Sequence, residues 1–208
     1  MNIEVFNPIN VNAPRERIYA RLGYSRAKTK LNQKQKQQTE LYIDQALSLI
    51  ELKGAALRLE IRELKDDIVK LSRGVEFKSA DLVQFFQGCG QVLVMGATSG
   101  ADIVREIHVQ GEGKDITAAV VYDAAASEMT DVALAWMVSY FNNVLRRENQ
   151  CLTKRRFSAG YGDFSLENQK LICDLIKFND LGVSVSDNFI LQPEKSVTAV
   201  AGIKLLNS

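Results

Sequence analysis

The segment ALRLEIREL, residues 56–64, decides the fold class of this protein. Leu57, Leu59 and Ile61 alternate in it with charged residues. Side chains point to opposite faces along a strand, so this pattern predicts a strand with one buried and one solvated face. Parallel sheets are covered on both faces, whereas antiparallel sheets often leave one face in water. We therefore predict an α+β fold, with a largely antiparallel twisted sheet and flanking helices.

The segments on both sides of this strand are predicted to alternate unevenly between helices and further strands. Asn32 and Gln35 form a capping-box pattern, and apolar residues at helical spacing follow it, with Gly54 as the expected helix stop. The other expected helices cover residues 78–88, 127–149 and 165–176, and the other expected strands cover 91–100, 115–123 and 181–206. We interpret Ser127 to Asp131 as residues of a helix start. A single domain is expected over residues 1–208.

The beginning of the chain is basic. Between Arg15 and Lys36 there are eight Lys or Arg residues and one acid, Glu16. A solvated surface of helix and loop is one interpretation of such a run, and a docking patch for an acidic partner or an anionic cofactor is the alternative. We expect residues 1–36 to pack on the domain as a basic N-terminal segment.

The overall charge argues against two classes of partner. The net charge of +1 gives no electrostatic reason to bind DNA or an anionic membrane, and no apolar segment is long enough to span a bilayer. The chain starts without the pattern of a signal peptide. Cys89, Cys151 and Cys173 lack the spacing of a disulfide framework or a zinc site, which suits a reducing compartment. We expect a cytoplasmic protein that binds neither nucleic acid nor a membrane.

A glycine turn follows the second apolar strand. VLVMGATSG, residues 92–100, resembles the nucleotide-binding turn of the short-chain dehydrogenases. Pyrophosphate binding requires a glycine near the helix start, but Asp102 stands there and its charge would repel a phosphate. The Tyr-x-x-x-Lys pair of that family is missing too, because Val144 comes four residues after Tyr140. We interpret residues 96–100 as a structural turn, and a small-molecule enzyme built on it is the weakest of our hypotheses.

A second glycine-containing loop, RRFSAGYGDFSLENQ at residues 155–169, carries the stronger binding signal. It lies between two predicted helices, and backbone N–H groups are free where a helix begins. Arg156 offers a planar guanidinium suited to a carboxylate or a phosphate. Tyr161, between two glycines, can place its ring over a flat ligand or a cation. These residues alone leave two interpretations open, a binding loop and a structural turn with exposed cations.

The same residues resemble a known family. Arg156-Phe-Ser-Ala-Gly160-Tyr161 fits the Arg-x-x-x-Gly-Tyr loop of the activation (reactivation) domain of cobalamin-dependent methionine synthase. The likeness continues through SLENQKLICDLI and through LGVSVSDNFILQPEKSVTAV, which is similar to a strand and a Pro-x-x-Ser-Val stretch of that domain. It is most specific over residues 155–200. Shorter pieces, such as RLGY and YDAAASEMTDVALAWM, resemble small stand-alone relatives of the domain.

The resemblance implies an accessory role. That domain binds S-adenosylmethionine and presents its methyl group to the cobalt of a cobalamin carried by another domain or subunit, once a flavodoxin-like electron donor has reduced the metal. This chain would then help to reactivate a cobalamin-dependent methionine synthase or a related corrinoid methyltransferase, rather than act as a self-sufficient enzyme. The cobalamin would come from the partner, because the chain has no Asp-x-His-x-x-Gly pattern and His108, its single histidine, does not fit one.

The resemblance also implies roles for particular residues. Arg156 would hold the carboxylate of the methionine part of the ligand. Ser158, Ala159 and Gly160 would offer backbone groups at close approach, and Tyr161 would face the corrin. No catalytic side chain and no metal ligand is implied, because the sulfonium and the reduced cobalt are the reacting groups and the protein places them.

The motif departs from the family after its tyrosine. Gly162 and Asp163 follow Tyr161, where the methionine synthase domain has Gly-Tyr-Pro. Proline fixes φ and removes an N–H group, so we expect this loop to be more mobile or differently hydrogen-bonded. The alternative to the accessory role is a non-catalytic partner-binding module that keeps the fold and has lost S-adenosylmethionine binding.

Overall fold

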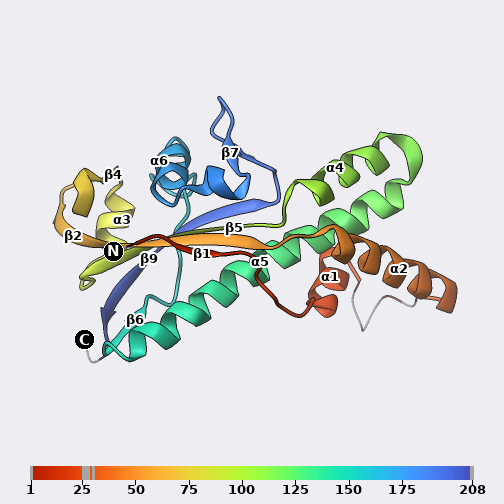
Figure 1. The fold of residues 1–208 in the computed structure, drawn as a ribbon, viewed down its shortest axis with the longest axis horizontal. Coiled ribbons are helices and arrows are strands. Elements are labelled where there is room, and N and C mark those ends of the chain that lie inside the picture. Colours follow the sequence, from red (N-terminus) through yellow and green to blue (C-terminus); the bar gives the residue numbers. More distant parts are fainter. Residues whose placement is uncertain (1, 25–28, 30, 207–208) are drawn as a thin grey trace.

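The computed structural model describes residues 2–24, 29 and 31–206 and contains an uneven succession of helices and strands (Figure 1). In chain order the elements are β1 (Glu4–Phe6), α1 (Arg15–Arg21), α2 (Gln33–Leu49), β2 (Lys53–Lys65), β3 (Ile68–Leu71), η1 (Ser72–Gly74), β4 (Glu76–Lys78), α3 (Ala80–Phe85), β5 (Gln91–Thr98), α4 (Ala101–Val109), η2 (Gln110–Lys114), α5 (Ile116–Arg146), β6 (Gln150–Leu152), α6 (Asn168–Leu175), η3 (Phe178–Leu181), β7 (Ser184–Val185), β8 (Leu191–Gln192) and β9 (Ser196–Leu205).

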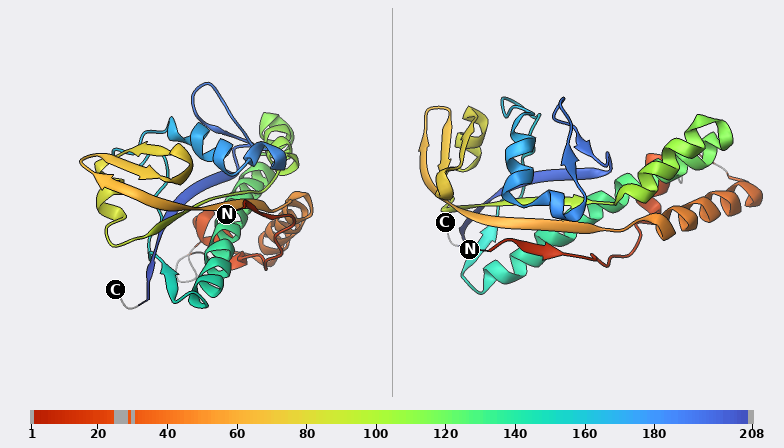
Figure 2. Two further views of the ribbon diagram at one scale, coloured as in Figure 1. Left: turned by 60° about the vertical axis from the view of Figure 1, so that its left-hand side comes forward. Right: turned by 45° about the horizontal axis from the view of Figure 1, so that its top comes forward.

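The main sheet is antiparallel at each of its pairings. Its strand order is β4-β3-β2-β5-β9-β6, and β1 pairs with the start of β2. β5 therefore runs antiparallel to both of its neighbours, whereas a dinucleotide-binding fold needs parallel strands at this point. The sheet is curled, and helices pack on both of its faces (Figure 2). The predicted α+β class with a largely antiparallel sheet is confirmed.

Residues 56–64 lie in β2 as predicted, but the second face of the strand is not solvated over residues 54–58, because α5 packs on it. Leu57 and Leu59 are buried in the core cluster that also contains residues of α3, α6 and η3. Ala56 faces the opposite core, under α5. Arg58 lies on that second face too, and its side chain is 15% exposed because it extends to Gln91 and Glu148.

The segment 115–123, predicted to be a strand, is instead the first part of α5. Asp115 is its N-cap and accepts a hydrogen bond from the Ala118 N–H. The helix runs through Ser127, which the sequence analysis placed near a helix start. Periodicity cannot separate a short apolar run in a strand from one in a buried helix. Here α1, α2 and α4 pack around this part of α5 beyond the end of the sheet and bury Ala118, Val121 and Tyr122, whereas Ile116 and Val120 stay exposed.

A second local prediction is also wrong. The capping box of Asn32 and Gln35 is present, but α2 ends at Leu49 and Gly54 lies inside β2. A Cβ atom on Gly54 would be 2.7 Å from the Met137 sulfur of α5 and 2.9 Å from the Gly96 carbonyl oxygen. This glycine is therefore needed for close packing, not for ending a helix.

Among the described helices, none is both long and apolar enough to cross a membrane.

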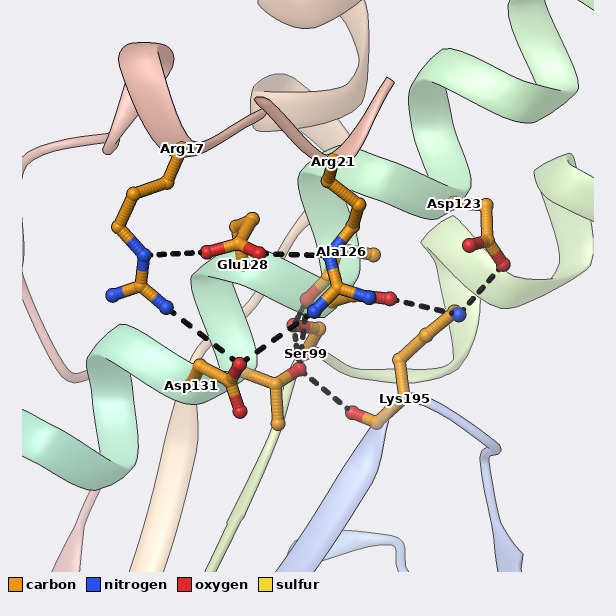
Figure 3. A network of polar contacts seen from close by, with 10 residues as sticks. Arg17, Arg21, Ser99, Asp123, Ala126, Glu128, Asp131 and Lys195 are labelled. Atoms are coloured by element: carbon orange, nitrogen blue, oxygen red, sulfur yellow. Dashed lines mark hydrogen bonds and ion pairs between the residues drawn. The ribbon is translucent and has the colours of Figure 1, made fainter. Parts of the chain in front are cut away.

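The basic N-terminal segment is held by ion pairs within the chain (Figure 3). Arg21 Nε donates to Glu128 Oε1 at 2.7 Å, and Arg17 Nε lies 2.7 Å from Oε2. Oε2 receives no well-aligned hydrogen bond from the described residues, so the contact with Arg17 is chiefly electrostatic. Arg15 pairs with Glu40 and Asp44 of α2.

These pairs change the interpretation of the basic run. Its arginines on α1 are neither purely solvated nor free for a partner, because acids of α2 and α5 already face them. Arg26, Lys28 and Lys30 belong to the same run and lie outside the described residues.

Glu128→Gln should lower the free energy of unfolding by about 1–3 kcal/mol, because it leaves two arginines facing a neutral, buried side chain. Asp131→Asn is the control: Asp131 is 45% exposed and 3.6 Å and 3.7 Å from the same arginines. The Asp131→Asn substitution should lower the free energy of unfolding by less than about 1 kcal/mol. Urea unfolding of both variants measures the difference, and equal costs would show that burial of Glu128 is not the source of its contribution.

Gly96→Ala should destabilise the fold by about 1–3 kcal/mol through overpacking. A Cβ atom at this position would be 2.8 Å from the Phe178 ring and 2.9 Å from the Ile176 side chain, both buried. Gly90→Ala, just before the same strand, has open space around the new methyl group and serves as the control. If Gly96→Ala unfolds at the same urea concentration as the wild type, the close approach of η3 to β5 does not constrain the fold.

Candidate functional site

The loop predicted to bind a ligand is fixed along the edge of the sheet. After β6 the chain continues beside β9, and Phe157 and Val200 exchange two backbone hydrogen bonds of 2.9 Å and 2.8 Å. The Ser158 hydroxyl donates to the Thr198 carbonyl oxygen at 2.8 Å. Arg156 and Ser158 therefore belong to a rigid sheet edge, a better support for a binding site than a mobile turn.

Arg156 lines a surface groove of about 550 Å³. The groove lies between α5 and the segment that follows β6, and its lining consists of Ala135, Val138, Ser139, Leu152, Thr153, Lys154, Arg155, Arg156 and Ala201. Arg156 is exposed, and its guanidinium has no ion pair or hydrogen bond with any residue that the structure describes. Arg155 lines the same groove.

The other predicted residues form the turn beyond the groove. Ala159 is buried, whereas Tyr161 is 70% exposed. Gly160 has a φ of +90°, a conformation that favours glycine. Its N–H donates to the Phe164 carbonyl oxygen at 2.7 Å, and the Tyr161 N–H donates to the Ser158 carbonyl oxygen at 3.3 Å. These two N–H groups are used inside the turn and are therefore not free for a ligand.

Asp163 explains the departure from the family motif. Its carboxylate accepts hydrogen bonds from the Ser79 hydroxyl and from the Ala80 N–H, the latter at 2.7 Å, at the start of α3. Gly162 has a φ of +55°, and a Cβ atom there would be 2.1 Å from the Asp81 carboxylate. Gly162 thus permits the close approach to α3, and Asp163 joins the loop to it.

Asp131 is an acid of α5 that lies one helical turn before Ala135 but is not among the residues that line the groove. It is half-exposed, and among the described residues it faces Arg17 and Arg21 of α1 at 3.6 Å and 3.7 Å. The prediction of a helix start at Ser127 to Asp131 is wrong, because these residues lie inside α5.

A larger groove, of about 880 Å³, lies between the N-terminal segment and α5. Asn7, Asn10, Asn12 and Trp136 are among its lining residues. Its Lys53 is paired with Glu51 at 2.7 Å, so this groove offers no unpaired cation for an anionic group. The smaller groove beside Arg156 therefore fits a carboxylate-bearing ligand better, despite its size.

Nucleophilic and metal chemistry receive no support from the geometry. Burial raises the pKa of the Cys89 thiol, and burial raises that of Cys173 to about 12. Both thiols are therefore protonated near neutral pH and are poor nucleophiles. In the described part of the chain, no three His, Cys, Asp or Glu side chains come together in a way that could hold a metal ion.

Asp163→Asn should destabilise the protein near neutral pH and less so in acid. The Ser79 hydroxyl and the Ala80 and Asp81 N–H groups hold the pKa of the Asp163 carboxyl below its usual range. A lowered folded-state pKa contributes stability above the unfolded-state pKa of about 4, and this contribution disappears as the pH falls through the folded-state pKa. The free energy of unfolding, measured from pH 2 to 7, should therefore converge for the two proteins at low pH. Asp187→Asn, at an exposed loop position, should leave the pH profile unchanged.

Comparison with known proteins gives a likeness in structure and none in sequence. No protein-family profile matches the chain, and no curated protein matches it. Among solved structures, the crystal structure of the MetH reactivation domain bound to AdoHcy superposes with a TM-score of 0.69 at 11% identity, covering 97% of this chain and 78% of that one. At this identity the match shows a shared fold: this chain has the α+β fold of the methionine synthase reactivation domain.

Proposed function

We propose that this protein binds S-adenosylmethionine in the groove beside Arg156 and serves as an accessory protein in the reactivation of a cobalamin-dependent methyltransferase. The observation that carries the proposal is the unpaired Arg156 guanidinium beside a groove, in a fold shared with a domain whose solved structure contains AdoHcy. The loop sequence Arg-x-x-x-Gly-Tyr of that family starts at this arginine.

The groove has the size and chemistry for such a ligand. Its volume of about 550 Å³ falls within the range of roughly 300–1,000 Å³ common for small-molecule sites. Arg156 can form a bidentate pair with the ligand carboxylate. The exposed Tyr161 ring can cover a flat or cationic group.

The chain's own part in the reaction is placement. S-adenosylmethionine supplies an electrophilic methyl group when bound, and the corrinoid that accepts it would be brought by a partner protein. Holding donor and acceptor in line removes the entropic cost of their encounter and requires no general acid or base. This agrees with a groove that contains cations and small residues but no histidine. A flavodoxin-like electron donor would be a further partner.

Arg156→Ala should weaken AdoHcy binding by about 2 kcal/mol, roughly 30-fold in Kd, because it removes a charge-assisted pair. Isothermal titration calorimetry with AdoHcy and with S-adenosylmethionine measures the effect. Lys114→Ala changes an exposed cation of η2 that does not line the groove, so this variant is the control and should bind as the wild type does.

The rival function predicts a different result. A partner-binding module that has lost the ligand would give no heat and no thermal shift with either compound at millimolar concentration. Binding that survives Arg156→Ala unchanged but is lost in Arg155→Ala would move the carboxylate contact to the neighbouring arginine. Binding insensitive to both substitutions would place the ligand outside this groove.

A further inference from the structure

Many cations of this protein are paired with acids inside the chain, namely Arg15, Arg17, Arg21, Lys53, Arg58, Arg62, Lys70, Lys78, Arg105 and Lys195. Other cations, such as Lys34 and Lys114, are exposed and have no such partner among the described residues. Five unpaired cations are grouped on either side of β6: Arg146, Arg147, Lys154, Arg155 and Arg156, which we call the basic edge. All five are exposed, and over residues 2–24, 29 and 31–206 none of their side chains has a hydrogen-bond or ion-pair partner.

The single acid in this stretch does not neutralise the basic edge. Glu148 lies between the two halves, but Arg58 of β2 holds its carboxylate through two hydrogen bonds, of 2.9 Å and 2.5 Å. The same pair lowers the pKa of Glu148, so the carboxylate stays charged and stays bound to Arg58. An arginine from another strand thus satisfies the acid, and the five local cations are left without an intramolecular counter-charge.

The basic edge lies where a partner can reach it. β6 is the last strand in the order of the main sheet, and α5 ends beside it at Arg146. Asn142 of α5 accepts a hydrogen bond from the Leu152 N–H at 3.0 Å, which fixes the helix end to the strand. Figure 1 shows this corner at the end of the molecule opposite to the tips of α2 and α4. The cations therefore lie on a rigid part of the fold, where the end of α5 is hydrogen-bonded to β6.

Helix electrostatics explains only part of this arrangement. Arg146 and Arg147 lie at the C-terminus of α5, where a cation offsets the partial negative charge of the helix end. Lys154 and Arg155 follow β6 and lie at no helix end, so that effect gives no reason for their charge. The grouping of unpaired cations after β6, in a protein whose net charge is only +1, therefore needs another explanation.

We infer that the basic edge is a docking surface for an acidic face of another protein. Unpaired cations around a folded edge attract an oppositely charged surface and raise the rate of encounter. A nucleic acid fits less well, because the sequence pI is about 7.6 and no aromatic side chain stands among the five cations for base stacking. A single phosphate fits less well too, since the cations are spread over a helix end and a separate loop instead of converging.

This docking surface goes beyond the proposed function and does not depend on it. It adjoins the groove through Arg156, so a protein bound there would cover the groove entrance. The two proposals fail separately, because Arg146 and Arg147 do not line the groove and can be changed without touching the ligand site.

The test uses poly-L-glutamate as an acidic polypeptide probe, with binding followed by fluorescence anisotropy at 50 mM and 300 mM salt. Arg146→Glu/Arg147→Glu should weaken binding about tenfold or more at low salt, and the difference should shrink at high salt as the charges are screened. Lys34→Glu/Lys114→Glu changes the net charge equally, at exposed positions in the first turn of α2 and at the end of η2, and should have little effect. Arg146→Gln/Arg147→Gln is the milder variant if charge reversal at the helix end impairs folding.

Three results would overturn the inference. Equal losses in the two charge-reversal variants would mean that net charge alone attracts the probe. Binding of wild type that salt does not weaken would exclude an electrostatic surface. Tighter binding of a single-stranded RNA oligonucleotide than of poly-L-glutamate would assign the basic edge to nucleic acid. AdoHcy titration of Arg146→Glu/Arg147→Glu should match the wild type, and this keeps the outcome independent of the groove.

Discussion

The close packing of both sheet faces at two glycines is the constraint on which the structure depends. Gly54 of β2 and Gly96 of β5 lie in adjacent strands, where Gly54 pairs with Ala97 and Gly96 with Ala55. The absent side chain of Gly54 makes room for Met137 of α5 on one face. That of Gly96 makes room for Phe178 and Ile176 on the other. Protein interiors have almost no spare volume, so this position fixes how close α5 and η3 come to the sheet.

The site follows from that packing. Because α5 lies flat against the sheet, its face at residues 135–139 meets the segment after β6, and the groove forms between them. The same helix carries Glu128 and Asp131, which face the arginines of α1. One long helix thus connects the N-terminal segment, the candidate ligand site and the basic edge.

The net charge of this protein does not show where its unpaired charges lie, because many charged side chains are paired with one another. The net charge is +1. Yet the α1 arginines form ion pairs with acids of α2 and α5, whereas the five cations around β6 form none with the described residues. The sequence analysis gave its attention to the basic run at 15–36, where much of the described charge is internal. The grouped unpaired cations are instead in the run at 146–156, whose one acid is paired with an arginine ninety residues away.

The sequence by itself determined the features that depend on neighbouring residues. The alternation in residues 56–64 gave the antiparallel α+β class, the capping box gave the start of α2, and the Arg-x-x-x-Gly-Tyr spacing located the loop beside the groove. Only the tertiary structure decided that residues 115–123 form a helix, that Gly54 belongs to a strand, and that Asp163 binds the start of α3. Each of these depends on which distant segment packs against the residue, as with Ser79 and Asp163, 84 positions apart. Local propensity and periodicity carry no information about such partners.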